Sequence, residues 1–384
     1  MKRADIPGQE ELKNVLTAMV DRDSLPHALL IHEQPGGTGL VAARFLTQYL
    51  LCENKQGGDT CGSCANCIKV QNNTHPDVHY IFPVNKTKGI SKSEHFITDN
   101  VAEEVRAFLA NQPYGDVRDW YTAINIEKNK GIISAAEGKE VAKKLMLRAY
   151  EGGYRIFIVW TAELMNDTFA NKILKNLEEP SDKTIFLLVT STPSQLLTTI
   201  VSRVQRFQED PVSEDVLANF LVNRLGLNRP KALDLAFRAE GNVHEAMKEA
   251  EGIVDPWLEE FKKWMRMAYV RDIGGMHNWC DKMSKNTRDA QIMFATGALK
   301  VIDRCYRLGW MDINIPMEGE EAKFYKDFSP FINTANAEGF LDLIQEAAFH
   351  IERNVNPKIV WFDTSIKAIR LVHAGKKSRA QAQA

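Results

Sequence analysis

The stretch HALLIHEQPGGTGLVAARFLTQYLL (residues 27–51) decides the fold of this 384-residue chain. Its apolar run HALLI (27–31) predicts a buried strand, and LVAARFLTQYLL (40–51) predicts a helix. The turn between them is rich in glycine and contains Gly36, Gly37 and Gly39. A strand, a glycine-rich turn and a helix in this order form the context of a phosphate-binding loop.

The residues that give such a loop its chemistry are missing here. A working loop reads G-x-x-x-x-G-K-[ST], and alignment on Gly39 puts Gln34 at the first glycine. Leu40 replaces the lysine and cannot neutralise phosphate, while Val41 replaces the hydroxyl residue that binds Mg²⁺. The turn is therefore either a coincidence or the remnant of a nucleotide site.

A second element of the same kind of site is also altered. RIFIV (155–159) lacks polar alternation, which predicts a strand buried on both faces of a parallel sheet. In a P-loop ATPase, acidic residues at the end of such a strand help to hold the metal. Trp160 and Thr161 occupy these positions. Two separate losses favour a degenerate ATPase domain over a coincidental turn.

Strands and helices alternate up to about residue 209. Further strands are predicted at 74–83, at 184–192 and within the end of 198–208, and further helices at 8–22 and 166–180. Another helix is expected to begin after Ser134, which with Glu137 forms a capping-box pattern. The alternation predicts an α/β domain of three layers around a parallel sheet.

Beyond residue 209 the pattern becomes helical throughout. Short helices are predicted at 213–226, 229–239 and 243–251, followed by a helical region from Pro256 to about His373 and a frayed basic tail at 375–384. We therefore predict an α/β domain at 1–209 with a partly helical insertion at 84–131, a small helical domain at 210–252 and an all-α domain at 253–384. The C-terminal tryptophans (Trp257, Trp264, Trp279, Trp310 and Trp361) are expected mainly in the core, some of them at subunit contacts.

Four cysteines give the sharpest chemical signal. Cys52, Cys61, Cys64 and Cys67 form the pattern C-x8-C-x2-C-x2-C, which brings four thiolates within reach of one Zn²⁺. Because four protein ligands close the tetrahedral shell, we expect a structural zinc in the module 52–67. The alternative, a set of unligated core thiols, fits poorly with the polar, glycine-flanked surroundings. Cys280 and Cys305 are expected to be core thiols.

Composition excludes several classes of protein. The formal net charge of −2 does not indicate a general attraction to nucleic acid. No apolar run approaches the roughly 18 residues of a membrane span. The start, MKRADIPGQEE, lacks the apolar core of a secretory signal, so we expect a cytoplasmic protein without membrane contact.

The order of these motifs resembles the clamp-loader subunits of bacterial DNA polymerase III, which belong to the AAA+ superfamily. IPGQEELKNVL, PHALLIHEQPGGTG, the four cysteines, HPDVHYI, NKILKNLEEP and LLVTSTPSQLLTTIVSRVQRF carry the resemblance. It covers about 8–82 and 131–250, whereas 84–131 does not match and the C-terminal helices match only in kind. The ATP-hydrolysing (gamma/tau) subunits keep the lysine, threonine and acidic pair. The delta-prime type lacks ATP hydrolysis, and this sequence sides with it.

The resemblance implies a role for one arginine. The family's Ser-Arg-Cys motif corresponds to Ser202, Arg203 and Val204 here. In the family this arginine reaches the γ-phosphate bound by the next subunit, as a trans-acting arginine finger. A guanidinium suits that work because it is permanently charged and its fork matches phosphate oxygens. The alternative is an ordinary surface arginine, and valine in place of the cysteine is expected to alter packing only.

A further family position, the sensor arginine of the small helical domain, is His244 here. A neutral histidine is a poor permanent partner for phosphate. We interpret His244 as a surface residue of a helix and as a third loss from the nucleotide site.

The resemblance thus implies a non-hydrolysing clamp-loader subunit with no ATP in its own site. Its expected partners are the gamma/tau and delta subunits, with the sliding clamp and primed DNA reached through the complex. The 210–252 segment would be the lid and 253–384 the oligomerisation collar. Two alternatives stay open: an ATP-hydrolysing subunit of the same complex, and a zinc-dependent DNA-binding module, which the near-neutral charge disfavours.

Overall fold

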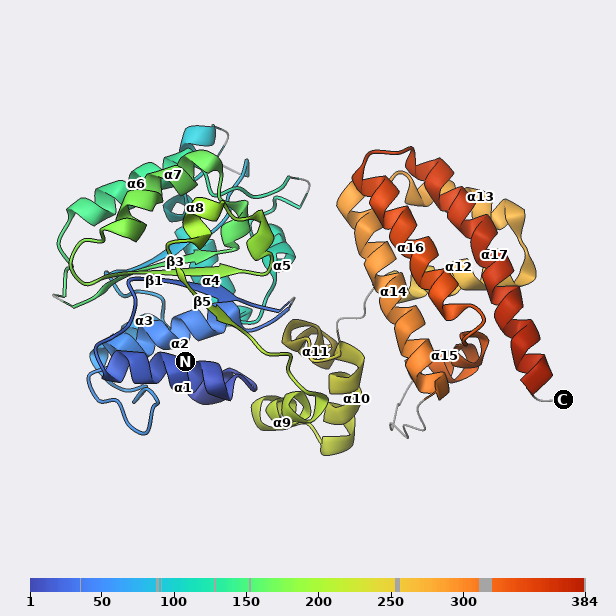
Figure 1. Cartoon of the computed structure of the whole chain (residues 1–384), viewed down its shortest axis with the longest axis horizontal. Coiled ribbons are helices and arrows are strands. Elements are labelled where there is room, and N and C mark those ends of the chain that lie inside the picture. The colour runs from blue at the N-terminus through green and yellow to red at the C-terminus, as the bar shows by residue number, and fades with distance from the viewer. Residues whose placement is uncertain are drawn as a thin grey trace. The chain divides into compact units, whose positions relative to one another are not determined.

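The chain consists of two compact units, Met1–Lys248 and Glu249–Ala384, which are described separately (Figure 1). The computed structural model describes residues 1–34, 36–87, 90, 92–127, 129–151, 153–252, 256–310 and 320–382. The first unit contains the sheet domain and the three short helices after it, except for the last two residues of the third helix. The finer division into three domains stays a prediction.

Among the described residues, the first unit contains one sheet of five parallel strands in the order β2-β3-β4-β1-β5. The strands are β1 (Ala28–His32), β2 (Val78–Ile81), β3 (Arg155–Trp160), β4 (Thr184–Thr190) and β5 (Gln205–Gln208). Every residue of β3 and β4 is buried. The absence of alternation in these two segments is thereby explained, and the predicted α/β class with a parallel sheet is confirmed.

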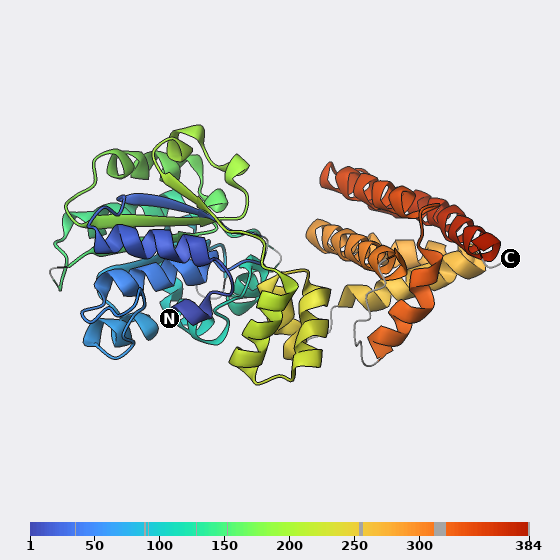
Figure 2. The same ribbon diagram turned by 60° about the horizontal axis from the view of Figure 1, so that its bottom comes forward.

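Helices cover both faces of the sheet, which makes three layers (Figures 1 and 2). One face carries α6 (Ala135–Met146), α7 (Asp167–Glu178) and α8 (Thr198–Val201), and the other α1 (Glu10–Asp21), α2 (Gly39–Leu51) and α3 (Ala65–Gln71). The side chains of Val141, Phe169 and Ile200 pack with those of Leu30, Phe157 and Phe186 in one core. Short 3₁₀ helices lie at Arg3–Asp5, Ser93–His95, Thr98–Val101, Ala162–Leu164, Pro193–Gln195 and Ser329–Phe331.

The insertion predicted at 84–131 is partly helical and packs into the same unit. It contains α4 (Ala102–Asn111) and α5 (Val117–Ala123). Phe108 of α4 and Trp120 of α5 form an aromatic cluster with Phe82 and Trp160, with ring centroids 4.8–6.2 Å apart. Trp160, at the end of β3, thus serves as an apolar anchor for the insertion.

Three short helices lie at the end of the first unit: α9 (Glu214–Leu225), α10 (Arg229–Ala239) and α11 (Val243–Ala250), whose last two residues already belong to the second unit. Their limits follow local signals in the sequence. Ser213 and Asn228 accept backbone hydrogen bonds as N-caps of α9 and α10. Gly226 ends α9 with φ +67°, a left-handed conformation that favours glycine.

The capping box predicted at the start of α6 forms only in part. The Ser134 side chain accepts hydrogen bonds from the backbone of Ala136 and Glu137. The Glu137 carboxylate instead accepts hydrogen bonds from the backbone N–H (2.6 Å) and Oγ1 (3.0 Å) of Thr98. A tertiary contact with the insertion therefore takes the carboxylate that the local pattern assigned to the helix end.

Burial raises the pKa of Glu137 to about 7, from an ordinary value of 4.5. The unfolded chain releases this proton at a lower pH than the folded chain, so the contribution of Glu137 to stability should fall as pH rises from about 4.5 to about 7. In Glu137→Gln this contribution is absent. We expect the variant to lose less stability than the wild type between about pH 5 and about pH 7.5, as measured by urea unfolding. Parallel changes in the two proteins would contradict the prediction.

The second unit is helical over its described residues. It comprises α12 (Pro256–Val270), α13 (Ile273–Met283), α14 (Arg288–Trp310), α15 (Glu320–Phe328), α16 (Ala337–Glu352) and α17 (Pro357–Ala382). The frayed tail predicted at 375–384 is wrong up to Ala382, because α17 continues through it. The lysine, arginine, alanine and glutamine residues there are good helix formers and can extend a packed helix.

Tryptophans form the centre of this unit, as predicted. Trp264, Trp279 and Trp361 are buried, and the Trp264 and Trp279 rings stack with centroids 5.7 Å apart. Trp264 Nε1 donates a hydrogen bond to Ser365 Oγ (2.9 Å), and Trp257 packs at the edge of the cluster. The Trp310 side chain lies outside the described residues.

Trp264→Ala should strongly destabilise the second unit. Removing a fully buried indole costs about 3–5 kcal/mol of unfolding free energy, and here Ser365 also loses its donor. Urea unfolding monitored in the full chain measures the loss. Val270→Ala, at an exposed position of the same helix, is the control, with an expected change within about 0.5 kcal/mol. Similar losses in the two variants would show that Trp264 is not central to the core.

Candidate nucleotide loop, arginine finger and zinc module

The glycine-rich turn lies where β1 passes into α2. Pro35 is outside the described residues, and Gly36 has φ +68°. A Cβ at Gly36 would lie 2.0 Å from Asn242 Oδ1, so the position requires glycine for both conformation and space. Leu40 and Val41 are buried in the core. The residues that replaced the phosphate ligands are therefore packing residues of α2.

Two carboxylates of the same chain accept hydrogen bonds from the N–H and O–H groups of this turn. Glu209 accepts from Thr38 Oγ1 (2.7 Å) and from the backbone N–H groups of Thr38 (3.1 Å) and Gln34 (3.3 Å). Glu33 accepts from the backbone N–H of Gly39, the first residue of α2 (3.0 Å). The positive end of α2 is thus neutralised internally.

The segment before α11 closes the turn from the other side. The backbone N–H of His244 donates to Gly36 O (3.2 Å), and the His244 Nδ1 lies 3.0 Å from Tyr114 O. His244 Nε2 faces the carboxylates of Asp119 (3.4 Å) and Asp116 (3.7 Å). The interpretation of His244 as a surface residue is wrong. It is buried because the insertion packs against it, a contact that its sequence neighbours do not reveal.

The cavity beside the turn has a volume of about 220 Å³. Pockets that hold drug-sized ligands are typically about 300–1,000 Å³. Its lining includes Glu33, Glu163 and the 113–118 segment of the insertion. Burial, with Glu209 and Glu163 nearby, raises the pKa of Glu33 well above its ordinary value. The space is therefore small and lined by carboxyl groups, and the raised pKa of Glu33 shows that it is a poor place to add further negative charge such as a triphosphate.

Trp160 and Thr161 end β3 at the same edge of the sheet. Trp160 is buried among aromatic rings, and Thr161 has φ +53° with its Oγ1 donating to Trp160 O (2.6 Å). Neither residue can supply a carboxylate for a metal. Glu163, two residues further, accepts a hydrogen bond from Ser191 Oγ (3.2 Å).

Arg203 lies at the end of the sheet where the strands begin, whereas the turn lies at the end where they finish. It precedes β5, whereas the turn follows the carboxyl end of β1, and β5 runs parallel to β1. The four residues of β5 alone separate the two edges by roughly 13 Å at about 3.3 Å per residue. The Arg203 side chain is 34% exposed and pairs with Glu178 of α7. Arg203 NH1 also donates to Thr199 O (2.9 Å) and to Ser202 Oγ (3.3 Å).

The four predicted zinc ligands come together. The Sγ atoms of Cys52, Cys61, Cys64 and Cys67 all lie within 4.8 Å of one another. The Cys64 side chain caps α3 by accepting from Cys67 N (3.5 Å), while Cys61 Sγ accepts from the backbone of Ser63 (3.5 Å) and Cys64 (3.3 Å). These backbone hydrogen bonds lower the pKa of Cys61 to about 6. Four convergent thiols with N–H···S support fit a tetrahedral metal such as Zn²⁺.

The sequence of the first unit matches that of a family of known proteins. The family model described as "DNA polymerase III, delta subunit" matches residues 8–212. The chain belongs to this family of clamp-loader subunits. Its curated relatives include several proteins named delta-prime, and its sheet domain with helices on both faces is of the AAA+ type.

The relatives of this clamp-loader family member include proteins named delta' and proteins named tau. The DNA polymerase III subunit delta' of Escherichia coli K12 is 25% identical over 79% of this chain and 78% of its own length. That of Yersinia pestis is 29% identical over 46% of this chain and 39% of its own length. The tau subunit of E. coli K12 is 24% identical over 64% of this chain and 32% of its own length.

Sequence reasoning missed several residues at the turn of this family member. Glu209, Glu33 and Asn242 surround it, yet none belongs to the loop pattern. One signal was available. Glu209 directly follows a strand that pairs with β1, and the carboxyl ends of parallel strands meet at one edge.

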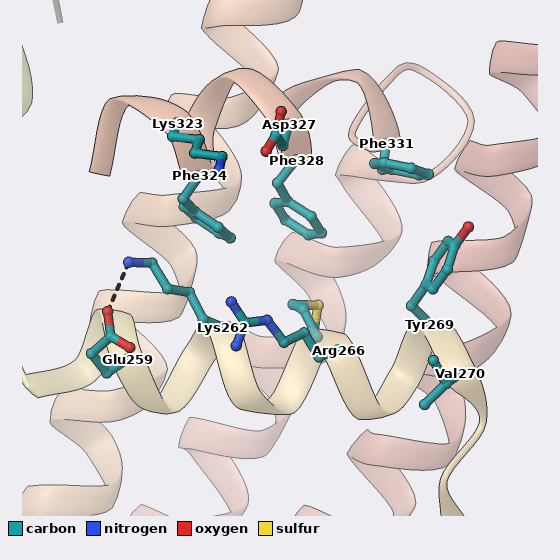
Figure 3. Close-up of a pocket in the computed structure, with 11 residues that line it drawn as sticks. Glu259, Lys262, Arg266, Tyr269, Val270, Lys323, Phe324, Asp327, Phe328 and Phe331 are labelled. Atoms are coloured by element: carbon teal, nitrogen blue, oxygen red, sulfur yellow. Dashed lines mark hydrogen bonds and ion pairs between the residues drawn. The ribbon is translucent and has the colours of Figure 1, made fainter. Parts of the chain in front are cut away.

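The second unit of this clamp-loader family member has a separate cavity between α12 and α15, of about 560 Å³ (Figure 3). Phe324 and Phe328 of α15 point toward α12, where Lys262 donates to Glu259 (2.7 Å) and lies 5.2 Å from the Phe324 ring centroid. The residues predicted as functional are not in this lining.

No helix in the described part of the chain is both long and apolar enough to cross a bilayer.

Proposed function

We propose that this chain is the non-hydrolysing delta-prime subunit of a DNA polymerase III clamp loader. It completes the ring of related subunits and donates Arg203 to the ATP site of a neighbour. Its own loop holds no nucleotide. The gamma/tau and delta subunits are its direct partners, and the sliding clamp and primed DNA are reached through the complex.

The observation that carries the proposal is the separation of Arg203 from the chain's own loop. Arg203 is at one edge of the sheet, and the loop at the other is filled by Glu209 and Glu33. A guanidinium at that edge, in a side chain that is about one third exposed, can meet only a nucleotide held by another chain. The Glu178 carboxylate pairs with this guanidinium and can be exchanged for a γ-phosphate, which carries more charge.

Zinc in this proposal is structural. Cys52, Cys61, Cys64 and Cys67 would hold it, and four thiolates leave no open coordination position. The bound ion would fix the start of α3 against the end of α2, where Cys52 lies. We further propose that the helices of the second unit join a collar with those of other subunits.

The alternative of an ATP-hydrolysing subunit requires groups that this chain lacks at the expected positions. Leu40 and Trp160 are buried packing residues there. The alternative of a zinc-dependent DNA-binding module requires free basic residues at the cysteines. Lys69 is paired with Glu151, and Lys55 lies over the Tyr49 ring.

The proposal is tested by mixing the purified chain with the gamma/tau and delta subunits of the same organism. Size-exclusion chromatography asks whether a defined complex forms, and a DNA-stimulated ATPase assay asks whether its turnover depends on Arg203. Failure to form a complex would remove the proposed function.

A further inference from the structure

The turn after β1 is shaped around an anion that belongs to the protein itself. Glu209 immediately follows β5, and the pairing of His32 with Gln208 places it beside the beginning of the turn. Its carboxylate receives three donors: Thr38 Oγ1 at 2.7 Å, Thr38 N at 3.1 Å and Gln34 N at 3.3 Å. In a working loop, backbone N–H groups of this kind surround phosphate oxygens.

We propose that Glu209 is a built-in substitute for phosphate and is the residue that excludes external anions from this loop. This inference deepens the proposed function and rests on its premise that the chain holds no nucleotide of its own. The loss of the lysine and threonine removes attraction for ATP, whereas Glu209 actively fills the place where a phosphate group would bind.

The tightness of the contact supports this assignment. Glu209 is 1% exposed. A Cβ at Gly37 would lie 2.3 Å from Glu209 Oε2 and 2.7 Å from Gln34 O, so the turn closes directly on the carboxylate. An incoming phosphate cannot share this space with Glu209. It would also meet the negative charge of that carboxylate at short range.

The same arrangement fixes neighbouring parts of the unit. With Glu209 in place, Gly36 accepts a hydrogen bond from the N–H of His244, and Asn242 packs against Gly36. In this chain, therefore, the contact between the turn and the α11 segment forms without a nucleotide. A subunit of this kind would present one constant shape throughout the ATP cycle of its neighbours.

Chemical rescue by inorganic phosphate tests the proposal. Glu209→Ala in the full chain leaves the donors of Thr38 and Gln34 without their acceptor, so its thermal midpoint should fall. Millimolar inorganic phosphate should then raise the midpoint of the variant, because a ligand that binds only the folded state stabilises it. The wild type should show no such rise. Chloride at matched ionic strength controls for general salt effects.

Glu163→Ala is the matched control, since Glu163 lines the same cavity and accepts its hydrogen bond from Ser191. Its midpoint should respond to phosphate as the wild type does. Amide hydrogen exchange gives a second readout: phosphate should slow exchange at Gln34 and Thr38 in Glu209→Ala. If that variant does not fold, Glu209→Gln, which loses the charge at nearly constant size, replaces it.

Two outcomes would overturn the proposal. One is stabilisation of the wild type by phosphate to the same extent as the variant. The other is the absence of any phosphate effect on the variant's midpoint and exchange rates. Neither outcome depends on Arg203 or on partner subunits, so this test and that of the proposed function fail separately.

Discussion

Serine in place of Cys64 should reduce the bound zinc from about one equivalent to nearly none and destabilise the first unit. The four Sγ atoms lie within 4.8 Å of one another, and replacing one thiolate by a hydroxyl opens the tetrahedral shell. Serine can still cap α3 by accepting from Cys67 N, so the loss of the cap is largely avoided. Zinc content by elemental analysis and the midpoint of thermal unfolding are the measurements.

The loss of stability in Cys64→Ser should be smaller than the stabilisation that zinc gives to a small isolated module. In isolated zinc-finger peptides, binding contributes roughly 10–16 kcal/mol, because the metal supports the whole fold. Here α2 is also buried against the sheet, so the unit keeps an apolar core when zinc is lost. Cys280→Ser, in the core of the second unit, is the control and should keep the full zinc content. A Cys64→Ser protein with undiminished zinc would disprove the ligand assignment.

The elements of the sheet domain could be predicted because their signals are local. The uninterrupted apolar runs of β3 and β4 arise from burial on both faces, and Ser213, Asn228 and Gly226 mark helix ends by their own backbone bonds. The four cysteines could also be assigned from spacing, since sixteen residues of chain with tight turns can reach only a small volume.

The environment of the loop could not be predicted because it depends on contacts between distant residues. Glu209 reaches Thr38 across 171 positions, and His244 meets Tyr114 across 130. Side-chain periodicity carries no information on such pairs. For the same reason the sequence places the Glu137 carboxylate at its own helix end, whereas in the structure it accepts a hydrogen bond from Thr98 of the insertion.

The insertion at 84–131 shows how one segment that cannot be predicted from its sequence also hides the contacts of its neighbours. Its polar, uneven sequence gave no clear period, so its packing on Trp160 and His244 was not foreseen. Once α4 and α5 are in place, tryptophan at the end of β3 is readily explained. At a position where P-loop ATPases have a metal-binding carboxylate, this chain has an indole that packs on Phe108 and Phe82.

Alanine in place of Arg203 should lower the DNA-stimulated ATPase of the reassembled complex while leaving its assembly intact. An arginine finger accelerates hydrolysis at the site it serves by roughly 10³–10⁵-fold. Turnover at that site should therefore be nearly lost, while sites served by other subunits continue. Assembly should survive because the exposed pair of Arg203 with Glu178 contributes only about 0–1 kcal/mol.

The choice of control variants separates a finger from a general basic patch. Arg206 lies three residues away at an exposed position of β5, so Arg206→Ala removes the same charge from the same segment. It should leave the ATPase unchanged. Arg203→Lys keeps the charge but loses the planar fork that bonds two phosphate oxygens, and it should remain impaired. Unchanged turnover in the Arg203→Ala complex, or equal loss with Arg206→Ala, would remove the finger assignment, because a permanently charged fork at one defined position is what the mechanism requires.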